Sequence, residues 1–137
     1  MSYARHLQTY RENQIHTADP GTILLMLYQG AIDFLRQAKA SLERGDVVEK
    51  GRCIARAHAI VSEFLASLDL RVGGELAQNL ESLYVFMLDQ ITAANLSNDP
   101  KPLEVVVSLL TTLKEGWEEA VAAERKRVSQ EGVWTRP

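Results

Sequence analysis

The chain has 137 residues, of which 46% are hydrophobic and 24% charged, a composition typical of one globular domain with its own core. Its formal net charge of -3 disfavours binding to nucleic acid or anionic lipid, because the overall field repels both. A single cysteine, Cys53, excludes an intrachain disulfide, and no apolar run reaches the roughly 18 residues of a membrane span. Since the N-terminus also lacks the layout of a secretory signal, the cytoplasm is the expected compartment.

Residues 1–18 are the first predicted segment and differ from the rest of the chain. Tyr3, Leu7 and Tyr10 recur at helical spacing and share one face. Polar residues then interrupt this face before the next helix begins. We therefore expect residues 1–18 to form a short amphipathic arm, with a frayed terminus as the alternative.

Four amphipathic helices are predicted in the remaining sequence. In each of them apolar residues recur at spacings of three and four, as on one buried helical face. No stretch shows the period-two alternation or the turn dipeptides of a β-hairpin. The expected helices span residues 20–44, 47–70, 75–95 and 101–127. The predicted buried face of the third helix consists of Leu76, Leu80, Leu83, Met87, Ile91 and Ala94.

Capping signals lie at the ends of these helices. Asp19 precedes Pro20, so a capping carboxylate is followed by a proline in the first turn, and Gly45 closes the pattern. Asp46 then opens the second helix, with Glu49 three residues later as its capping-box partner. A Gly-Gly pair and an Asn-Asp-Pro run mark the two later turns.

Short turns between helices of this length favour neighbours that pack antiparallel. The predicted fold is therefore an all-α, antiparallel four-helix bundle with a short N-terminal amphipathic arm. We expect the arm over residues 1–18, the bundle domain over 19–127 and a disordered tail over 128–137.

The segment ILLMLYQGAIDFL, residues 23–35, is more apolar than a bundle helix requires. At about 100° per residue its apolar side chains cover roughly 200°, with Met26 outside, whereas a peripheral helix needs little more than about 100°. The second predicted helix adds an apolar ridge that includes Ile60 and Phe64. Three explanations stay open: the arm covers the surplus, a partner docks on it, or this helix is the most central of the four.

Catalytic and metal-binding patterns are missing from the sequence. No histidine has a glutamate three residues before it, no His-x-x-x-His pair occurs, and Cys53 has no ligand partner at metal spacing. His58, the one candidate for a phosphotransfer histidine, lacks an adjacent basic residue. We therefore expect no enzyme, no cofactor and no metal site. The basic run 125–127 is interpreted as complementing the C-terminal end of the last helix, with contact to a membrane surface as the alternative.

Short motifs run through the chain in a fixed order from about residue 3 to residue 125. In the first half they are Tyr10, Asn13, Thr17-Ala18, Pro20, Leu25-Met26-Leu27-Tyr28, Gly30-Ala31, Ala57, Ile60-Val61 and Glu63. In the second half they are Ser67-Leu68-Asp69, Gly73-Gly74-Glu75-Leu76-Ala77, Asn79-Leu80, Leu83-Tyr84, Met87, Ala94-Asn95, Asn98-Asp99, Leu103-Glu104 and Trp117-Glu118.

In this order the motifs resemble the flagellin-specific secretion chaperones, the FliS family. The departures lie mostly in the third predicted helix, where the family usually has an aspartate after the first tyrosine and a pair of arginines a few residues later. In that stretch this chain has Val85, Phe86, Asp89 and Gln90. Any charge contact that the family residues make at these positions is therefore left open for this chain.

The resemblance implies a cytoplasmic export chaperone of the flagellar type III system. FliS-like proteins are helical bundles that bind the disordered C-terminal segment of flagellin in hydrophobic grooves between helices and prevent its premature polymerisation. They also help to deliver flagellin to the export gate, where the cytoplasmic domain of the membrane protein FlhA receives the complex. The resemblance further implies an arm that covers part of the groove until the client displaces it. A homodimer stays open, whereas nucleic acid and direct membrane insertion are not expected.

The expected contact residues combine the apolar pattern with the resemblance. Tyr10 is assigned to the arm and to engagement of the gate. Asn79, Tyr84 and Asn95 match family motifs and are predicted either to hydrogen-bond the client backbone or to serve the bundle itself, whereas Trp117 is predicted to be core. The main alternative function is a self-assembling structural bundle that buries the same surface against a second copy. For apolar docking we expect Leu24, Leu27, Tyr28, Ile60, Phe64 and Leu68.

Overall fold

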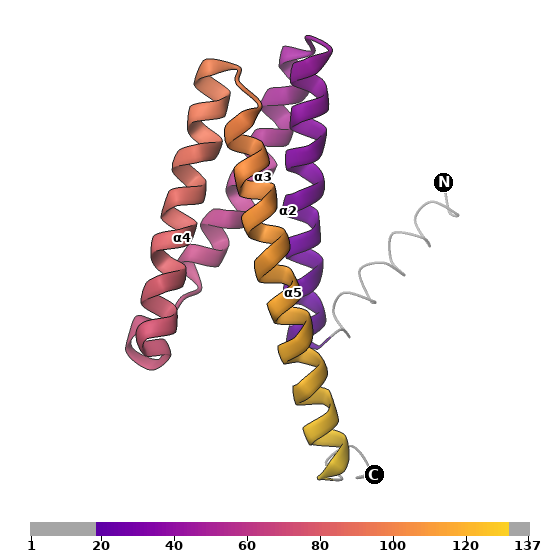
Figure 1. The fold of residues 1–137 in the computed structure, drawn as a ribbon, viewed down its shortest axis with the longest axis vertical. Coiled ribbons are helices and arrows are strands. Elements are labelled where there is room, and N and C mark those ends of the chain that lie inside the picture. Colours follow the sequence, from indigo (N-terminus) through magenta and orange to yellow (C-terminus); the bar gives the residue numbers. More distant parts are fainter. Residues whose placement is uncertain (1–18, 132–137) are drawn as a thin grey trace, which may run out of the picture.

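The structure is a computed structural model that describes residues 19–131. It contains four helices, α2 (Pro20–Glu43), α3 (Val47–Ala66), α4 (Leu70–Ser97) and α5 (Lys101–Gln130). Consecutive helices run antiparallel, and each packs against its two neighbours in the cycle from α2 through α3, α4 and α5 back to α2 (Figure 1). The predicted all-α four-helix bundle is confirmed. The predicted arm, and residues 132–137 of the predicted tail, lie outside the described residues.

Aspartate side chains cap α2 and α3 as predicted. The backbone N–H of Thr22 donates to Asp19 Oδ1 at 2.8 Å, and the backbone N–H of Glu49 donates to Asp46 Oδ1 at 3.1 Å. Each bond satisfies a donor that has no partner within the first turn of a helix. Pro20 occupies a position whose missing N–H costs nothing for the same reason. The cap residues therefore determine where both helices begin.

The turn from α2 to α3 is a Schellman motif. Gly45 has a φ of 77°, a left-handed conformation that is free of steric cost without a Cβ. The backbone N–H groups of Gly45 and Asp46 donate to carbonyls in the last turn of α2 at 3.2 and 2.9 Å. The predicted capping box was wrong, because the N–H of Asp46 is already used there and the Glu49 carboxylate accepts from Arg52 instead.

Helix α4 begins earlier than predicted, and α5 ends later. Residues 70–73 form a first turn, and Gly74, with φ 57° and ψ -136°, interrupts the helical backbone just before the predicted start. The predicted Gly-Gly break is thus a kink within α4. Helix α5 continues three residues beyond the predicted end at 127, to Gln130.

Arg125 ties the far end of α5 to the beginning of α2. Its Nη2 group donates to both carboxylate oxygens of Asp19, at 3.2 and 3.1 Å, and to the hydroxyl of Thr22. The backbone hydrogen bond from Thr22, followed by the contact with Arg125, holds the pKa of Asp19 below its usual value. The interpretation of the basic run was therefore incomplete, since Arg125 serves a contact between helices.

Lys50 fastens what we call the closed end of the bundle, the end that holds the α2–α3 and α4–α5 turns. Its side chain is buried, and Nζ donates to the backbone oxygen of Asn95 at 3.2 Å and to Asn98 Oδ1 at 2.8 Å. Asn98 is the left-handed residue that ends α4. A buried ammonium is costly unless its donors are satisfied, and here it also faces the negative end of the α4 dipole. Lys50 therefore joins α3 to α4.

The opposite end, which we call the open end, is wider. Helices α4 and α5 diverge toward it, and α5 projects beyond the start of α2 (Figure 1). The buried residues of α5 are Leu103, Val106 and Leu110, all in its first half. The core is therefore concentrated toward the closed end, and apolar side chains at the open end have fewer partners.

We expect Lys50→Ala to lower the free energy of unfolding by about 1–3 kcal/mol, because it removes the buried ammonium and both of its hydrogen bonds to the end of α4. Urea unfolding followed by circular dichroism measures the change. Arg52→Ala is the matched control, since Arg52 is an exposed side chain paired within α3 and its loss should change stability little. Equal effects of the two substitutions contradict the role assigned to Lys50.

Candidate docking surfaces

Three aromatic rings from three helices stack inside the bundle. Tyr28 of α2 and Phe64 of α3 have ring centroids 4.5 Å apart and nearly parallel planes, and Phe64 lies 5.6 Å from the ring of Tyr84 of α4. The hydroxyl groups of the two tyrosines are 2.5 Å apart and share a hydrogen bond. All three side chains are buried, with Tyr28 fully inaccessible. This aromatic cluster therefore connects α2, α3 and α4.

The polar atoms of the aromatic cluster are confined by burial. Burial raises the pKa of both tyrosine hydroxyls above the usual value, and the bond to Tyr28 raises that of Tyr84 further. The indole N–H of Trp117 is also buried and has no acceptor among residues 19–131. Trp117 packs partly buried against the core, as predicted. Because water does not reach the two tyrosine hydroxyls, each relies on the other as its hydrogen-bond partner.

Apolar side chains of α2 and α3 continue from the aromatic cluster toward the surface. Leu24, Ile60 and Leu68 are half-buried and pack against the edge of the core, and Leu27 is 39% exposed. Gly30 of α2 lies beside Ile60 of α3, since a Cβ built at Gly30 would be in ordinary van der Waals contact with Ile60 Cδ1, at 3.7 Å. We call the set Leu24, Leu27, Ile60 and Leu68 the α2–α3 surface.

The structure thus separates the predicted docking residues into two groups. Four of them form the α2–α3 surface, whereas Tyr28 and Phe64 lie beneath it in the aromatic cluster together with Tyr84. Asn79 and Asn95 are exposed on α4, and Asn95 also offers its backbone carbonyl to Lys50. Tyr10 lies outside the described residues.

Helix α4 exposes apolar side chains that the sequence pattern did not predict to be accessible. Leu76, predicted to be buried, is 60% exposed, and Val85 and Phe86 are exposed further along the helix. Leu76 lies just after the kink at Gly74, at the open end where neighbouring helices diverge. A periodic pattern reports which face is apolar but does not report where the neighbouring helix ends.

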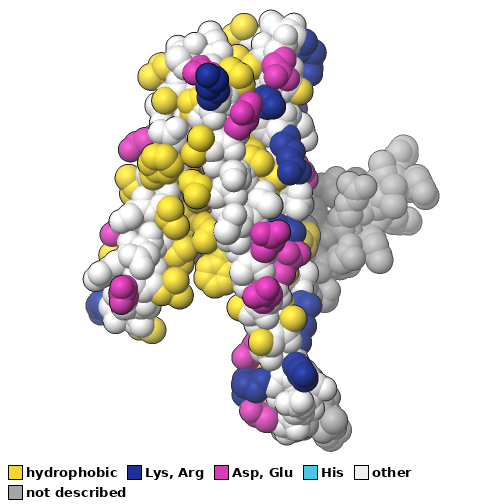
Figure 2. All heavy atoms as spheres, viewed as in Figure 1, with side chains coloured by type: hydrophobic (Ala, Val, Ile, Leu, Met, Phe, Trp, Pro, Cys, Tyr) yellow, Lys and Arg dark blue, Asp and Glu magenta, His cyan; other side chains and the backbone are white. Residues whose placement is uncertain are grey.

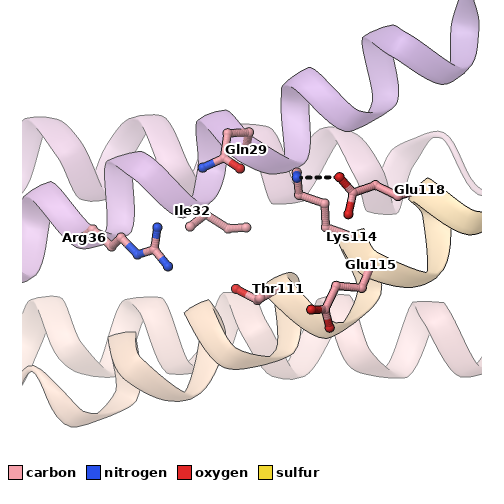
Figure 3. A pocket seen from close by; sticks show the side chains of 7 residues that line it. All are labelled: Gln29, Ile32, Arg36, Thr111, Lys114, Glu115 and Glu118. Carbon is pink, nitrogen blue, oxygen red and sulfur yellow. Dashed lines mark hydrogen bonds and ion pairs between the residues drawn. The ribbon is translucent and has the colours of Figure 1, made fainter.

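The seam between α2 and α5 is polar in its middle, whereas its open end holds a mostly apolar pocket lined by Pro20, Ala120, Val121 and Val128. The polar middle holds a cavity of about 170 Å³, into which Arg36 and Gln29 of α2 face opposite Thr111 of α5 (Figure 3). Lys114 and Glu118 form an ion pair of 3.1 Å at one side of it. Because charges of both signs line this cavity, it is a poor site for an apolar segment.

Two further properties bound what residues 19–131 can do. Within that range no group of three or more His, Cys, Asp or Glu side chains is placed to hold a metal ion. None of the described helices has the length and apolarity needed to cross a membrane. The half-buried leucines of α2 and α3 are apolar side chains at the surface, a feature that marks contacts with other polypeptides.

Comparison with known proteins agrees with this class. Residues 3–124 match the family model described as flagellar protein FliS. The chain is 37% identical to the flagellar secretion chaperone FliS of Vibrio cholerae over 117 residues, covering 82% of this chain and 86% of that one. It is 38% identical to flagellar secretion chaperone FliSB of Pseudomonas aeruginosa, covering 83% and 90% of the two chains. The corresponding protein of Salmonella typhimurium is 38% identical, with 83% and 85% covered.

A solved structure shares the fold. A flagellar chaperone from bacteria superposes with a TM-score of 0.71 and 21% sequence identity, covering 88% of this chain and 98% of the solved one. Helical architecture and sequence therefore lead to the same class, the chaperones of flagellar secretion. The chain belongs to the FliS family.

We expect Tyr84→Phe to destabilise the protein by about 1–2 kcal/mol, because it leaves the buried hydroxyl of Tyr28 without its partner. The double variant Tyr28→Phe with Tyr84→Phe should recover most of this loss, since it removes both polar groups and keeps the rings. Urea unfolding of the four proteins in this mutant cycle provides the coupling energy. Strictly additive losses contradict a shared hydrogen bond.

The raised pKa values of Tyr28 and Tyr84 predict a loss of stability in alkali. A folded-state pKa above that of the unfolded chain means that the stabilisation is complete below about pH 10 and decreases as the pH rises further. Unfolding midpoints measured from about pH 9 upward should fall more steeply for the natural chain than for the double phenylalanine variant. Parallel curves contradict the prediction, because the two proteins differ only at the two tyrosines.

Proposed function

We propose that this chain is a cytoplasmic export chaperone for flagellin. It binds the disordered C-terminal segment of flagellin on the α2–α3 surface, prevents premature polymerisation and helps to deliver the client to the flagellar type III export gate. The observation that carries the proposal is the accessible apolar α2–α3 surface in a member of the FliS family.

Binding without catalysis accounts for the apolar character of the surface. A disordered segment loses conformational entropy when it becomes ordered, so apolar contact area has to supply the affinity. Each Å² removed from water contributes about 25 cal/mol. Leu27, which is 39% exposed, lies three residues after the half-buried Leu24 on the same face of α2, so the helix offers both apolar side chains to a client.

The buried aromatic cluster supports this surface from beneath. In this proposal Tyr28 and Phe64 support docking from below the surface. Their stacked rings fix the spacing of α2 and α3, the two helices that carry the surface. The exposed amides of Asn79 and Asn95 on α4 have the chemistry to hydrogen-bond the backbone of a client that extends beyond the α2–α3 surface.

The proposal includes the arm and the gate. Tyr10, in the segment that leads into Asp19, is proposed to cover part of the client surface and then to engage the cytoplasmic domain of FlhA. The entry point of that segment supports the idea. Asp19 caps α2 little more than one turn before Leu24, and Arg125 holds both Asp19 and Thr22 in place there.

Leu27→Asp should weaken binding of a synthetic flagellin C-terminal peptide at least about tenfold, because a carboxylate replaces an apolar contact. Titration calorimetry at several temperatures measures it, and the natural chain should show one-to-one binding, a negative heat-capacity change and a gain in helix. Val48→Asp is the control, since Val48 is 83% exposed at the closed end. Undiminished binding by the folded Leu27 variant rules out the α2–α3 surface.

Tyr10→Ala should reduce capture of the chaperone–flagellin complex by the cytoplasmic domain of FlhA and leave the melting temperature unchanged, because residue 10 precedes the bundle. Pull-down and thermal unfolding measure the two properties separately. A large fall in melting temperature shows instead that Tyr10 belongs to the folded core.

A further inference from the structure

Helix α4 carries more of the exposed large apolar side chains than any other described helix. They are Leu70, Val72, Leu76, Val85, Phe86 and Leu96. Isolated exposed apolar residues are ordinary, whereas a contiguous group of them marks a contact surface. None of these side chains belongs to the α2–α3 surface, so the proposed flagellin site leaves them unexplained.

One row of apolar side chains runs along a single flank of α4. Leu76, Leu83 and Phe86 fall within about 80° at about 100° per residue, beside the buried stripe of this helix. Leu83 is half-buried against the core, whereas Phe86 is 43% exposed. Because α4 runs from the open end to the closed end, its right-handed winding turns this flank toward α5 (Figure 1).

A second row faces it from α5. Leu109, Leu113 and Trp117 are spaced four residues apart and pack half-buried against the core. Hydrophobic side chains fill the hollow between the two helices in the space-filling view (Figure 2). We call this hollow, with its two rows, the α4–α5 groove.

The borders of the α4–α5 groove are acidic. From Val72 to Pro100 the sequence contains no Lys or Arg. Glu75 and Asp89 lie on α4 beside the apolar row, and Glu119 is exposed on α5. Within residues 19–131 none of these three carboxylates takes part in an ion pair. Acidic side chains lie beside the hollow on α5 (Figure 2).

We propose that the α4–α5 groove is a second docking surface, for an amphipathic segment of another protein whose apolar stripe is flanked by Lys or Arg. The stripe covers Leu76, Leu83 and Phe86, and the flanking cations pair with the unpaired carboxylates. A second copy of this chain does not fit, because it would bring one acidic border against another. The proposal stands independently of flagellin binding at the α2–α3 surface.

Two synthetic helical peptides test the charge requirement. Both carry the same apolar stripe, and one has Lys and the other Glu at the flanking positions. Fluorescence anisotropy with the full chain should give at least about tenfold tighter binding of the Lys peptide, with an affinity that falls as salt is added. Equal affinities, or no binding of either peptide, overturn the proposal.

Substitutions locate the peptide and separate the two surfaces. Phe86→Ser should abolish binding of the Lys peptide and leave that of the flagellin peptide intact, and Glu75→Lys with Asp89→Lys should reverse the preference between the two synthetic peptides. Leu27→Asp should weaken binding of the flagellin peptide and leave binding of the Lys peptide intact. Loss of Lys-peptide binding in the Leu27 variant, with its fold confirmed by circular dichroism, contradicts a separate second surface.

Two further experiments test whether the α4–α5 groove is occupied instead by a second copy of the chain or by the chain's own N-terminal segment. Sedimentation that shows a dimer abolished by Phe86→Ser assigns the groove to a second copy and overturns the proposal. The second experiment uses a full chain with Arg5→Glu and Arg11→Glu. If this variant binds the Lys peptide much more tightly than the natural chain does, the groove belongs to the N-terminal segment and the proposal is overturned. An unchanged monomer and an unchanged affinity support the proposal.

Discussion

The hydrogen bond between the hydroxyls of Tyr28 and Tyr84, with Phe64 stacked alongside, is the contact on which the open half of the molecule depends. It is the point where α2, α3 and α4 meet inside the bundle, and it combines a large apolar area with one directional bond. Beyond it toward the open end the helices diverge (Figure 1), and the leucines around it are only partly covered. The cluster therefore allows apolar side chains to stay accessible without loss of the fold.

The seams of the bundle have different chemistry, and this difference determines what each can bind. The middle of the seam between α2 and α5 is polar and carries charges of both signs, so this part of the seam is suited to water (Figure 3). The α2–α3 surface is apolar and is the proposed site for flagellin. The α4–α5 groove is apolar with acidic borders, and its proposed occupant has the opposite charge. One small bundle thus offers distinct surfaces, as suits a member of a chaperone family.

Local signals predicted the fold well, because caps and periodicity act within a few residues of each other. Asp19, Asp46 and Gly45 perform their expected roles. The sequence was less informative where an interaction between distant parts decides the outcome. The apolar motif around Tyr28 indicated a docking residue but could not indicate that its buried hydroxyl bonds a partner 56 positions away in the sequence. Much of the wide apolar arc of α2 is likewise explained by packing against both α3 and α5, with Leu27 and Met26 left accessible.

The two ends of the bundle are held by different kinds of force. At the closed end Lys50 and the Schellman turn rely on directional hydrogen bonds, which tolerate little change in distance or angle. At the open end Arg125 links α5 to α2 by hydrogen bonds, whereas α4 is held there by dispersion and apolar contact, which permit small sliding movements of α4 without the loss of any single bond. We therefore expect the bundle to deform more easily at its open end than at its closed end, where the hydrogen bonds of Lys50 hold α3 and α4 together.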